Sequence, residues 1–221
     1  MKPARIQPLP FVDADDRDVE VSPLGLSGII NIPESAQMVA ICPGGTASGR
    51  FSPRTSYLAS VLRRSGIGTL LIDLLTNAED GKRENVFDVV KLADRLTICT
   101  RWLREEGAFG DRPIAAFPFG TAAAAALIAA ARDPALFTSI VCRSGRVDLA
   151  GKALEDLRTP VMLIAGGMDH DVLAVNRRVH ETLTVDKDLR VIPGASQLYE
   201  EAGTLDLAIG FARDWMLAHK G

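Results

Sequence analysis

The 221-residue sequence contains few side chains that could serve as a nucleophile or a general base. Its histidines are His170, His180 and His219, and its cysteines are Cys42, Cys99 and Cys142. Neither set has the spacing of a metal site or of a disulfide framework. We therefore expect no metal and no cofactor. A thiolate at Cys42 or Cys142 could act as a nucleophile if it were stabilised, but a buried structural cysteine is the default interpretation.

Other reactive groups have a simpler alternative interpretation. Asp169 and His170 are adjacent in GGMDHDV and could form an acid–base pair, although neighbouring loop residues usually point apart and a surface position for His170 is favoured. Thr121 could be a nucleophile, but at a helix start a threonine more often caps free backbone N–H groups. Ser196 could donate a hydrogen bond to a ligand, whereas an ordinary turn serine is favoured.

The hydrophobic pattern indicates which elements position these residues. Residues 1–18 combine prolines with an acidic run and are interpreted as an extended arm. Short strands are expected at 19–21, 26–32 and 38–42, where they suit an antiparallel edge. Further strands then alternate with helices. The strands are expected at 68–72, 114–119, 139–142, 161–165 and 189–192, and the helices at 57–64, 86–104, 121–132, 171–183 and 205–219.

This alternation predicts an α/β fold, with a mostly parallel sheet covered by helices on both faces and one domain over residues 19–221. Ligands of such sheets bind at the carboxyl ends of the strands. The net charge of −3 and the isoelectric point near 5.7 give no electrostatic footprint for nucleic acid or an anionic membrane. No signal segment or membrane span is evident, so we expect a cytoplasmic protein whose partner is a small molecule or a protein, a homodimer included.

Several motifs resemble those of small dienelactone-hydrolase-like α/β hydrolases. They are CPGGTASGRFSPR, FPFGTAAAAAL, CRSGRVDLAG, LIAGGMDHDV and VIPGASQLYEE, and they stand in the family's order and spacing over residues 19 to 219. The resemblance implies the α/β-hydrolase fold, in which a serine sits in a G-x-S-x-G turn between a strand and a helix.

The resemblance also implies that two catalytic side chains are missing. Gly120 stands at the position of the nucleophilic serine and should have a positive φ, because this turn holds its central residue in a strained conformation. Gln197 stands at the position of the histidine and cannot exchange a proton near neutral pH. Asp169 matches the third member, the acid. Gly44 replaces the histidine of the HG-type oxyanion loop.

The same resemblance places further residues near the pocket. Gly44, Gly45 and Thr46 belong to the oxyanion loop, and Phe119, before the turn, either faces the cavity or packs in the core. Arg50, Arg54, Arg143 and Arg146 follow the carboxyl ends of strands, where they could hold a carboxylate or phosphate. They could instead fix loops through carbonyls, Asp73 or Asp148; this second interpretation is favoured for Arg143 and Arg146, and neither is favoured for the other two.

Three functional hypotheses follow. The first is a hydrolase fold that keeps its pocket for binding or regulation without turnover, with a ligand that can be anionic because the bare helix start after Gly120 attracts negative charge. The second is a diverged enzyme performing lyase, isomerase or cyclase chemistry with Asp169 and backbone donors. The third is an ester or lactone hydrolase that uses unexpected residues. The first is preferred.

Overall fold

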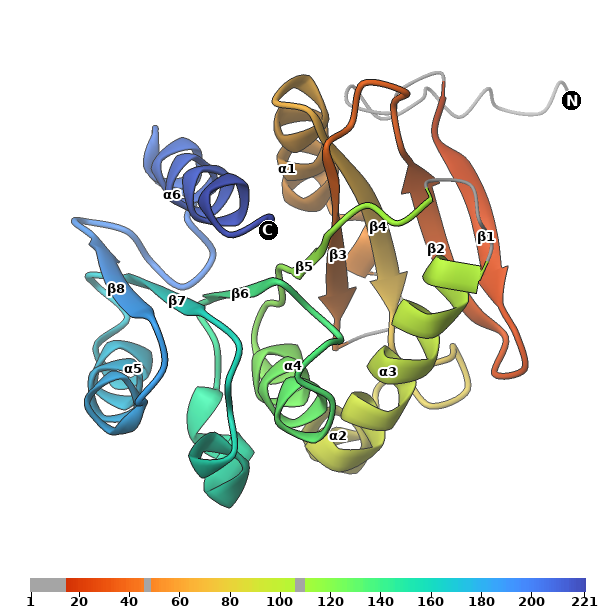
Figure 1. Ribbon diagram of the computed structural model, residues 1–221. Coiled ribbons are helices and arrows are strands. Elements are labelled where there is room, and N and C mark those ends of the chain that lie inside the picture. Colours follow the sequence, from red (N-terminus) through yellow and green to blue (C-terminus); the bar gives the residue numbers. More distant parts are fainter. Residues whose placement is uncertain (1–14, 46–48, 106–109) are drawn as a thin grey trace, which may run out of the picture.

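The structure, a computed structural model, describes residues 15–45, 49–105 and 110–221. An eight-stranded sheet runs through it in the order β1-β2-β4-β3-β5-β6-β7-β8 (Figure 1). The strands are β1 (Arg17–Val21), β2 (Leu26–Asn31), β3 (Met38–Gly44), β4 (Ile67–Asp73), β5 (Ile114–Ala116), β6 (Ser139–Arg143), β7 (Val161–Gly166) and β8 (Lys187–Ile192). β1 and β2 pair antiparallel, whereas β4, β3 and β5 to β8 are all parallel. The mostly parallel sheet is confirmed, and so is the antiparallel edge for the first two expected strands. The third, expected at 38–42, is instead β3, which lies inside the parallel part of the sheet between β4 and β5.

Helices cover both faces of this sheet. They are α1 (Pro53–Arg64), α2 (Arg83–Phe87), α3 (Val89–Glu105), α4 (Thr121–Arg132), α5 (His170–Thr182) and α6 (Thr204–Ala218), with 3-10 segments η1 (Gly49–Phe51) and η2 (Val147–Glu155). Helices α1 and α6 pack on one face, and α3, α4 and α5 pack on the other (Figure 1). The fold is that of the α/β hydrolases.

The expected helix at 86–104 is wrong at its start, because the chain forms two helices there. Asp88 has φ −77° and ψ 73°, which ends α2, and its carboxylate accepts a hydrogen bond from the Lys91 N–H at 3.1 Å in the first turn of α3. Such a bond satisfies a donor that a continuous helix would have used internally. Segment η2 was not expected either, since Gly151 at φ 54° interrupts its periodicity.

The core follows the two-residue period of the strands. In β3, Val39 and Ile41 enter the cluster beneath α3 and α4, while Met38, Ala40 and Cys42 enter the cluster beneath α1 and α6. Successive side chains of a strand point to opposite faces, so a sheet that is buried on both sides needs apolar residues at every position. The strands are therefore fixed between two packed layers. This also fixes the points at which the loops at their ends begin.

Helix α4 is buried along most of its length, from Thr121 to Ala130. A helix that is apolar all round belongs in the core, and alanine side chains let its axis approach the sheet and α3 closely. This packing holds the helix start, and with it the turn after β5, in one place.

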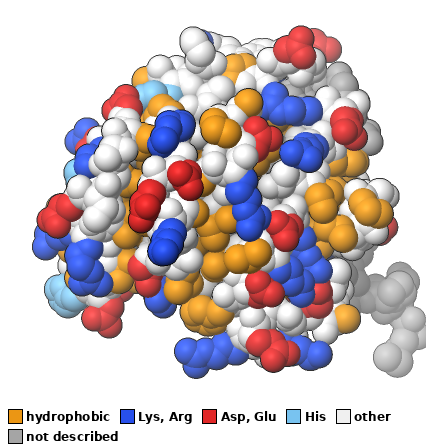
Figure 2. Space-filling model, turned by 60° about the horizontal axis from the view of Figure 1, so that its bottom comes forward, with side chains coloured by type: hydrophobic (Ala, Val, Ile, Leu, Met, Phe, Trp, Pro, Cys, Tyr) orange, Lys and Arg blue, Asp and Glu red, His pale blue; other side chains and the backbone are white. Residues whose placement is uncertain are grey.

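The surface carries charges of both signs. Figure 2 shows one face on which Lys and Arg side chains are interspersed with Asp, Glu and apolar side chains. Among the helices of the described ranges, none has the length and apolar character needed to cross a membrane.

Candidate functional site

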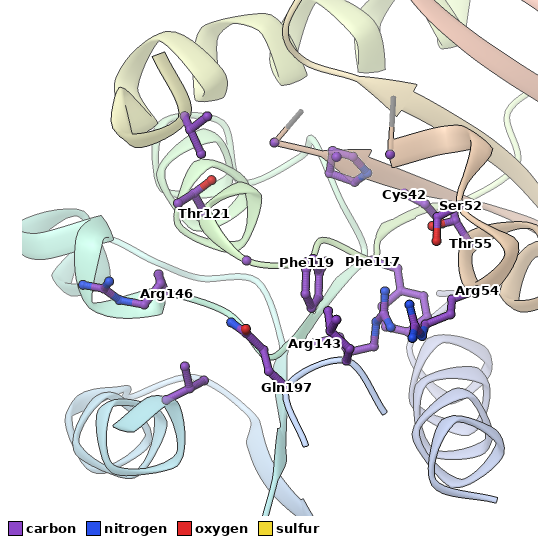
Figure 3. A pocket seen from close by; sticks show the side chains of 18 of the residues that line it. Cys42, Ser52, Arg54, Thr55, Phe117, Phe119, Thr121, Arg143, Arg146 and Gln197 are labelled. Carbon is purple, nitrogen blue, oxygen red and sulfur yellow. The ribbon is translucent and has the colours of Figure 1, made fainter. Parts of the chain in front are cut away.

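One cavity, of about 770 Å³, lies where the carboxyl ends of the parallel strands meet. Strand β3 ends there at Gly44 and β6 at Arg143, and the turns after β5, β7 and β8 bring in Gly120, Asp169 and Gln197. Figure 3 shows Arg143 and Gln197 at this cavity. Of the candidate residues named from the sequence, those that line the cavity are Cys42, Gly44, Gly45, Arg50, Arg54, Phe119, Gly120, Thr121, Arg143, Arg146, Asp169 and Gln197. Thr46 lies outside the described residues.

The turn at Gly120 has the geometry of a strand-to-helix elbow. Its φ of 62° and ψ of −129° show the positive φ that the sequence predicted. The Gly120 carbonyl accepts hydrogen bonds from the N–H of Ala123 at 3.2 Å and of Arg146 at 3.0 Å. An ideal Cβ at Gly120 would meet no other atom within 4 Å. The position is thus open in space but strained for any residue with a side chain.

Thr121 is the first helical residue of α4 rather than its cap. The cap position belongs to Gly120, so α4 has no side-chain cap hydrogen bond. The expected capping role of Thr121 therefore does not hold, because the hydroxyl sits one residue too far along the chain. Thr121 is 8% exposed and borders the cavity.

Two loops approach each other closely to bring Asp169 and Gln197 to the cavity. An ideal Cβ at Gly166 would lie 2.4 Å from the Ala195 carbonyl oxygen, so only glycine permits this approach. The Met168 N–H then donates to that carbonyl at 2.9 Å. The end of β7 and the loop after β8 are in this way fixed side by side.

Asp169 holds the start of α5. Its Oδ1 accepts a hydrogen bond from the Val172 N–H at 3.4 Å, while its buried Oδ2 has no hydrogen-bond partner among the described residues. A buried carboxylate oxygen without a donor is unusual, because desolvation is costly when it is not compensated. Gln197 is exposed at the mouth of the cavity.

Ser196 and His170 lie outside the cavity lining. The Ser196 N–H and hydroxyl both donate to the Glu201 carboxylate, at 3.0 Å and 3.3 Å, which is the arrangement of a turn serine. His170, the first residue of α5, is exposed. Its surface position agrees with the interpretation favoured from the sequence.

Segment η1 lies against a buried acid. Asp73, 1% exposed at the side chain, forms an ion pair with Arg50 and accepts a hydrogen bond from the Arg50 N–H at 3.2 Å. Burial raises the pKa of Asp73, and the Arg50 guanidinium opposes this. An ideal Cβ at Gly44 would lie 3.3 Å from Asp73 Oδ1, so a larger residue at position 44 would have to displace this pair.

The four arginines divide into two kinds. Arg50 pairs with Asp73, Arg54 with Glu200 and Arg146 with Asp148, the last at 2.8 Å. Arg143 has no carboxylate partner among the described residues, is 8% exposed and borders the cavity. Burial lowers its pKa, and the nearby positive charge of Arg54 acts in the same direction. For Arg143, the expected loop-fixing role through an acid is wrong.

The cysteines are buried and free. Cys42 borders the cavity at 8% exposure, and burial raises the pKa of its thiol to about 12. Burial also raises the pKa of Cys142. A thiol with so high a pKa stays protonated at neutral pH and is a poor nucleophile.

Sequence reasoning did not single out several cavity residues. Leu58 from α1, Val86 and Phe87 from the region of α2, and Leu198 after β8 all contribute apolar surface. The sequence pattern did not separate α2 from α3. It therefore gave no indication that residues of α2 line the cavity. Arg143, by contrast, was placed near the pocket from the sequence, because it is the last residue of a strand whose carboxyl end faces the site.

The comparison with solved structures gives a similar protein over nearly the full chain. A crystal structure of dienelactone hydrolase from Anabaena variabilis is 36% identical, with a TM-score of 0.85 over 94% of this chain and 100% of that chain. Est1E from Butyrivibrio proteoclasticus is 13% identical with a TM-score of 0.76, over 93% of this chain and 99% of that one. The second match shows the fold alone. The chain belongs to the dienelactone-hydrolase-like group of the α/β-hydrolase superfamily.

A further relative bears a different name. A Mycobacterium tuberculosis protein called "Putative phosphoribosyl transferase" is 39% identical over 206 residues, which are 92% of this chain and 46% of the relative. The chain thus spans about half the length of this relative. No family model matches the sequence.

Proposed function

We propose that this chain is a catalytically degenerate α/β-hydrolase-like protein that keeps its cavity for binding a small molecule. The observation that carries the proposal is Gly120 in the turn between β5 and α4, at φ 62°. Hydrolases of this fold present a nucleophilic side chain from that turn. A nucleophile needs an oxygen or sulfur atom, and glycine has no side chain at all.

The surroundings of Asp169 and Gln197 support the same conclusion. In a working triad the acid accepts a hydrogen bond from a histidine and orients it. Here Asp169 Oδ2 is buried without a donor, and Gln197, with no ionisable group, stands on the loop where the family carries histidine. An acid without a hydrogen-bond partner is expected if the serine and the histidine of a triad have been lost and Asp169 has remained.

No substitute pair of nucleophile and base is evident in the cavity. Thr121 and Cys42 border it, but no histidine is among its described lining residues. Without a base to take its proton, the Thr121 hydroxyl is a weak nucleophile at neutral pH. The third hypothesis, hydrolysis through unexpected residues, is therefore the least supported.

A non-hydrolytic reaction is the second candidate, and Asp169 is the observation in its favour. An acid that borders the cavity and has a buried oxygen without a described partner could position a substrate and stabilise charge without a covalent intermediate. The activity in the name of the mycobacterial relative is not carried over, because the match covers 46% of its length and a longer protein can hold that activity elsewhere.

The test is exposure of the purified chain to a chromogenic ester and to a fluorophosphonate, which labels activated serine and threonine. We expect no turnover above a heat-inactivated sample and no stoichiometric labelling. Ester turnover that disappears in Thr121→Ala or Cys42→Ala would show that a substitute nucleophile operates, and would overturn the proposal.

A further inference from the structure

Arg143 is a buried cation that lines the cavity without a compensating acid. It is 8% exposed, and within the described residues it forms neither an ion pair nor a side-chain hydrogen bond. Burying a charge without a partner is costly, so the folds that tolerate it usually do so at functional sites.

Aromatic rings hold the Arg143 guanidinium in place. Its central carbon lies 4.8 Å from the ring centroid of Phe119, 5.7 Å from that of Tyr199 and 6.0 Å from that of Phe117. The Tyr199 ring is itself fixed, because its hydroxyl donates to the Ile164 carbonyl at 3.2 Å and accepts from the Ser144 hydroxyl at 3.0 Å. Rings attract a cation but accept none of the directed hydrogen bonds that guanidinium N–H groups can donate.

The other cavity arginines are already neutralised. Arg50, Arg54 and Arg146 each pair with a carboxylate. Arg54 also lies near enough to Arg143 to lower its pKa, and Figure 3 shows both on the same side of the pocket. Arg143 therefore contributes one positive charge on this wall that no described acid balances. A ligand with a single negative charge would balance it.

The rest of the cavity is suited to an apolar group. Leu58, Val86, Phe87 and Leu198 border it together with the Phe119 ring. Ligand sites commonly combine apolar walls with a few placed polar groups that fix orientation. A volume of about 770 Å³ exceeds what one carboxylate needs and leaves room for a ring or chain attached to it.

We propose that Arg143 is the specificity-determining residue of this cavity and binds the carboxylate of an apolar organic acid through its guanidinium N–H groups. This inference rests on the proposed function, since it describes the ligand of that same cavity. The planar fork of an arginine matches the two oxygens of a carboxylate. The apolar body of the acid then lies against Phe119 and the neighbouring aliphatic side chains.

The test compares benzoate with benzamide, which has nearly the same shape but no charge. Binding is measured by titration calorimetry at low ionic strength and near neutral pH. Benzoate should bind about tenfold tighter than benzamide to the wild-type protein, because charge-assisted hydrogen bonds are stronger than neutral ones. In Arg143→Gln the ratio of the two affinities should fall to about one.

Arg190→Gln is the matched control. The Arg190 guanidinium also lies over a ring, 5.0 Å from the Phe211 centroid, but it pairs with Asp188 and does not border the cavity. The affinity ratio should be unchanged in this variant. If Arg143→Gln fails to fold by circular dichroism, Arg143→Lys keeps the charge without the planar fork and should lower the ratio several-fold relative to wild type.

Several outcomes would overturn the assignment. The assignment would be wrong if the wild-type protein bound benzoate and benzamide equally, or bound neither. It would also be wrong if the ratio of the two affinities were unchanged in folded Arg143 variants. Phenyl phosphate binding more tightly than benzoate would replace the carboxylate with a phosphate. Failure of the proposed function would look different, because turnover of phenyl benzoate would reveal a hydrolase while leaving the ratio of benzoate to benzamide unaffected.

Discussion

Gly120 carries the proposed function, and its effect on stability can be measured separately from that proposal. Its φ of 62° is a region that glycine enters freely and that other L-residues enter at a cost. An ideal Cβ there meets no atom within 4 Å, so steric collision adds nothing to that cost.

Gly120→Ala should therefore lower the free energy of unfolding by about 1–2 kcal/mol, through backbone strain alone. Gly210→Ala is the matched control. Gly210 lies inside α6, its ideal Cβ also meets nothing within 4 Å, and its φ is not positive. This control should raise the free energy of unfolding by about 0.5–1 kcal/mol, because alanine favours a helix. Urea denaturation of both variants is the measurement, and equal destabilisation by the two would contradict the explanation.

If the proposed loss of a serine and a histidine is correct, putting both side chains back should not by itself produce a hydrolase. Gly120→Ser with Gln197→His would place a nucleophile and a base near Asp169, yet we expect little esterase activity. Pro118 has no N–H to donate, Ala122 is fully buried and carries a methyl group that the family's glycine lacks, and the ion pair of Arg50 and Asp73 lies beside Gly44. A misplacement of about 1 Å in such a site can cost about a hundredfold in rate.

Fluorophosphonate titration of the double variant decides this prediction. The expected result is slow, substoichiometric labelling, together with a loss of about 1 kcal/mol or more of stability as serine takes on the strained backbone. Rapid labelling of one site per chain would mean that the oxyanion geometry is intact and that two side chains alone separate this protein from an active enzyme.

Among the elements, the segment between β4 and α3 is held by the carboxylate of Glu79. Arg95 from α3 donates to both Glu79 oxygens, at 2.6 Å and 2.7 Å, and Lys91 pairs with the same acid at 2.7 Å. The Thr76 N–H donates to it at 3.0 Å, and Arg95 also reaches the Leu74 carbonyl at 2.8 Å. This network ties the loop that precedes α2 to the outer layer of helices.

Glu79→Gln should lower the free energy of unfolding at neutral pH by about 1 kcal/mol. The Arg95 side chain holds the pKa of Glu79 below its ordinary value of 4.5 in the folded state. The carboxylate therefore contributes its full stability above pH 4.5 and loses it as the pH falls below that value. The variant should show a smaller loss of stability than wild type over this acid range.

Asp94→Asn serves as the comparison for Glu79→Gln. Asp94 pairs with Arg132 at 2.7 Å, but the two side chains are 62% and 50% exposed. Water screens such a pair, so the change should stay below about 0.5 kcal/mol. Chemical denaturation at several pH values measures both variants; an Asp94 effect as large as that of Glu79 would mean that the network around Glu79 adds nothing.

The sequence predicts the elements whose hydrophobic periodicity is continuous. It does not predict the places where a local hydrogen bond ends an element although the hydrophobic pattern continues. The strands, and the loops that carry Gly120 and Asp169, were predicted because the period and the motifs agree. The break at Asp88 depends on one side-chain bond to Lys91, which competes with an apolar pattern that continues through it. Arg143 pairs with no acid of the described ranges and packs among three rings, and spacing along the chain does not encode this packing.

At the scale of the whole molecule, the sheet separates two apolar clusters that could in principle lose their packing independently. Leu92 and Leu127 belong to the cluster under α3, α4 and α5, while Leu62 and Met216 belong to the cluster under α1 and α6. Residues of β3 and β4 enter both clusters on alternate positions. Because each central strand is shared, loss of one cluster exposes the other side of the same strands, and we predict that residues 19–221 unfold as one unit.

The three buried thiols and the two tryptophans offer a direct test of that unity. Cys42 lies in the cluster under α1 and α6, and Cys99 and Cys142 lie in the other. Trp215 packs against the first cluster and Trp102 against the second.

Burial raises the pKa of Cys42 and of Cys99 to about 12, so both thiols should react slowly in the native state. Single-cysteine and single-tryptophan variants, followed by pulsed thiol labelling and by fluorescence through a guanidinium titration, should all give one common midpoint. A lower midpoint for Cys42 and Trp215 than for Cys142 and Trp102 would show that α1 and α6 leave the sheet first, and that the cavity loses one wall while the other stays folded.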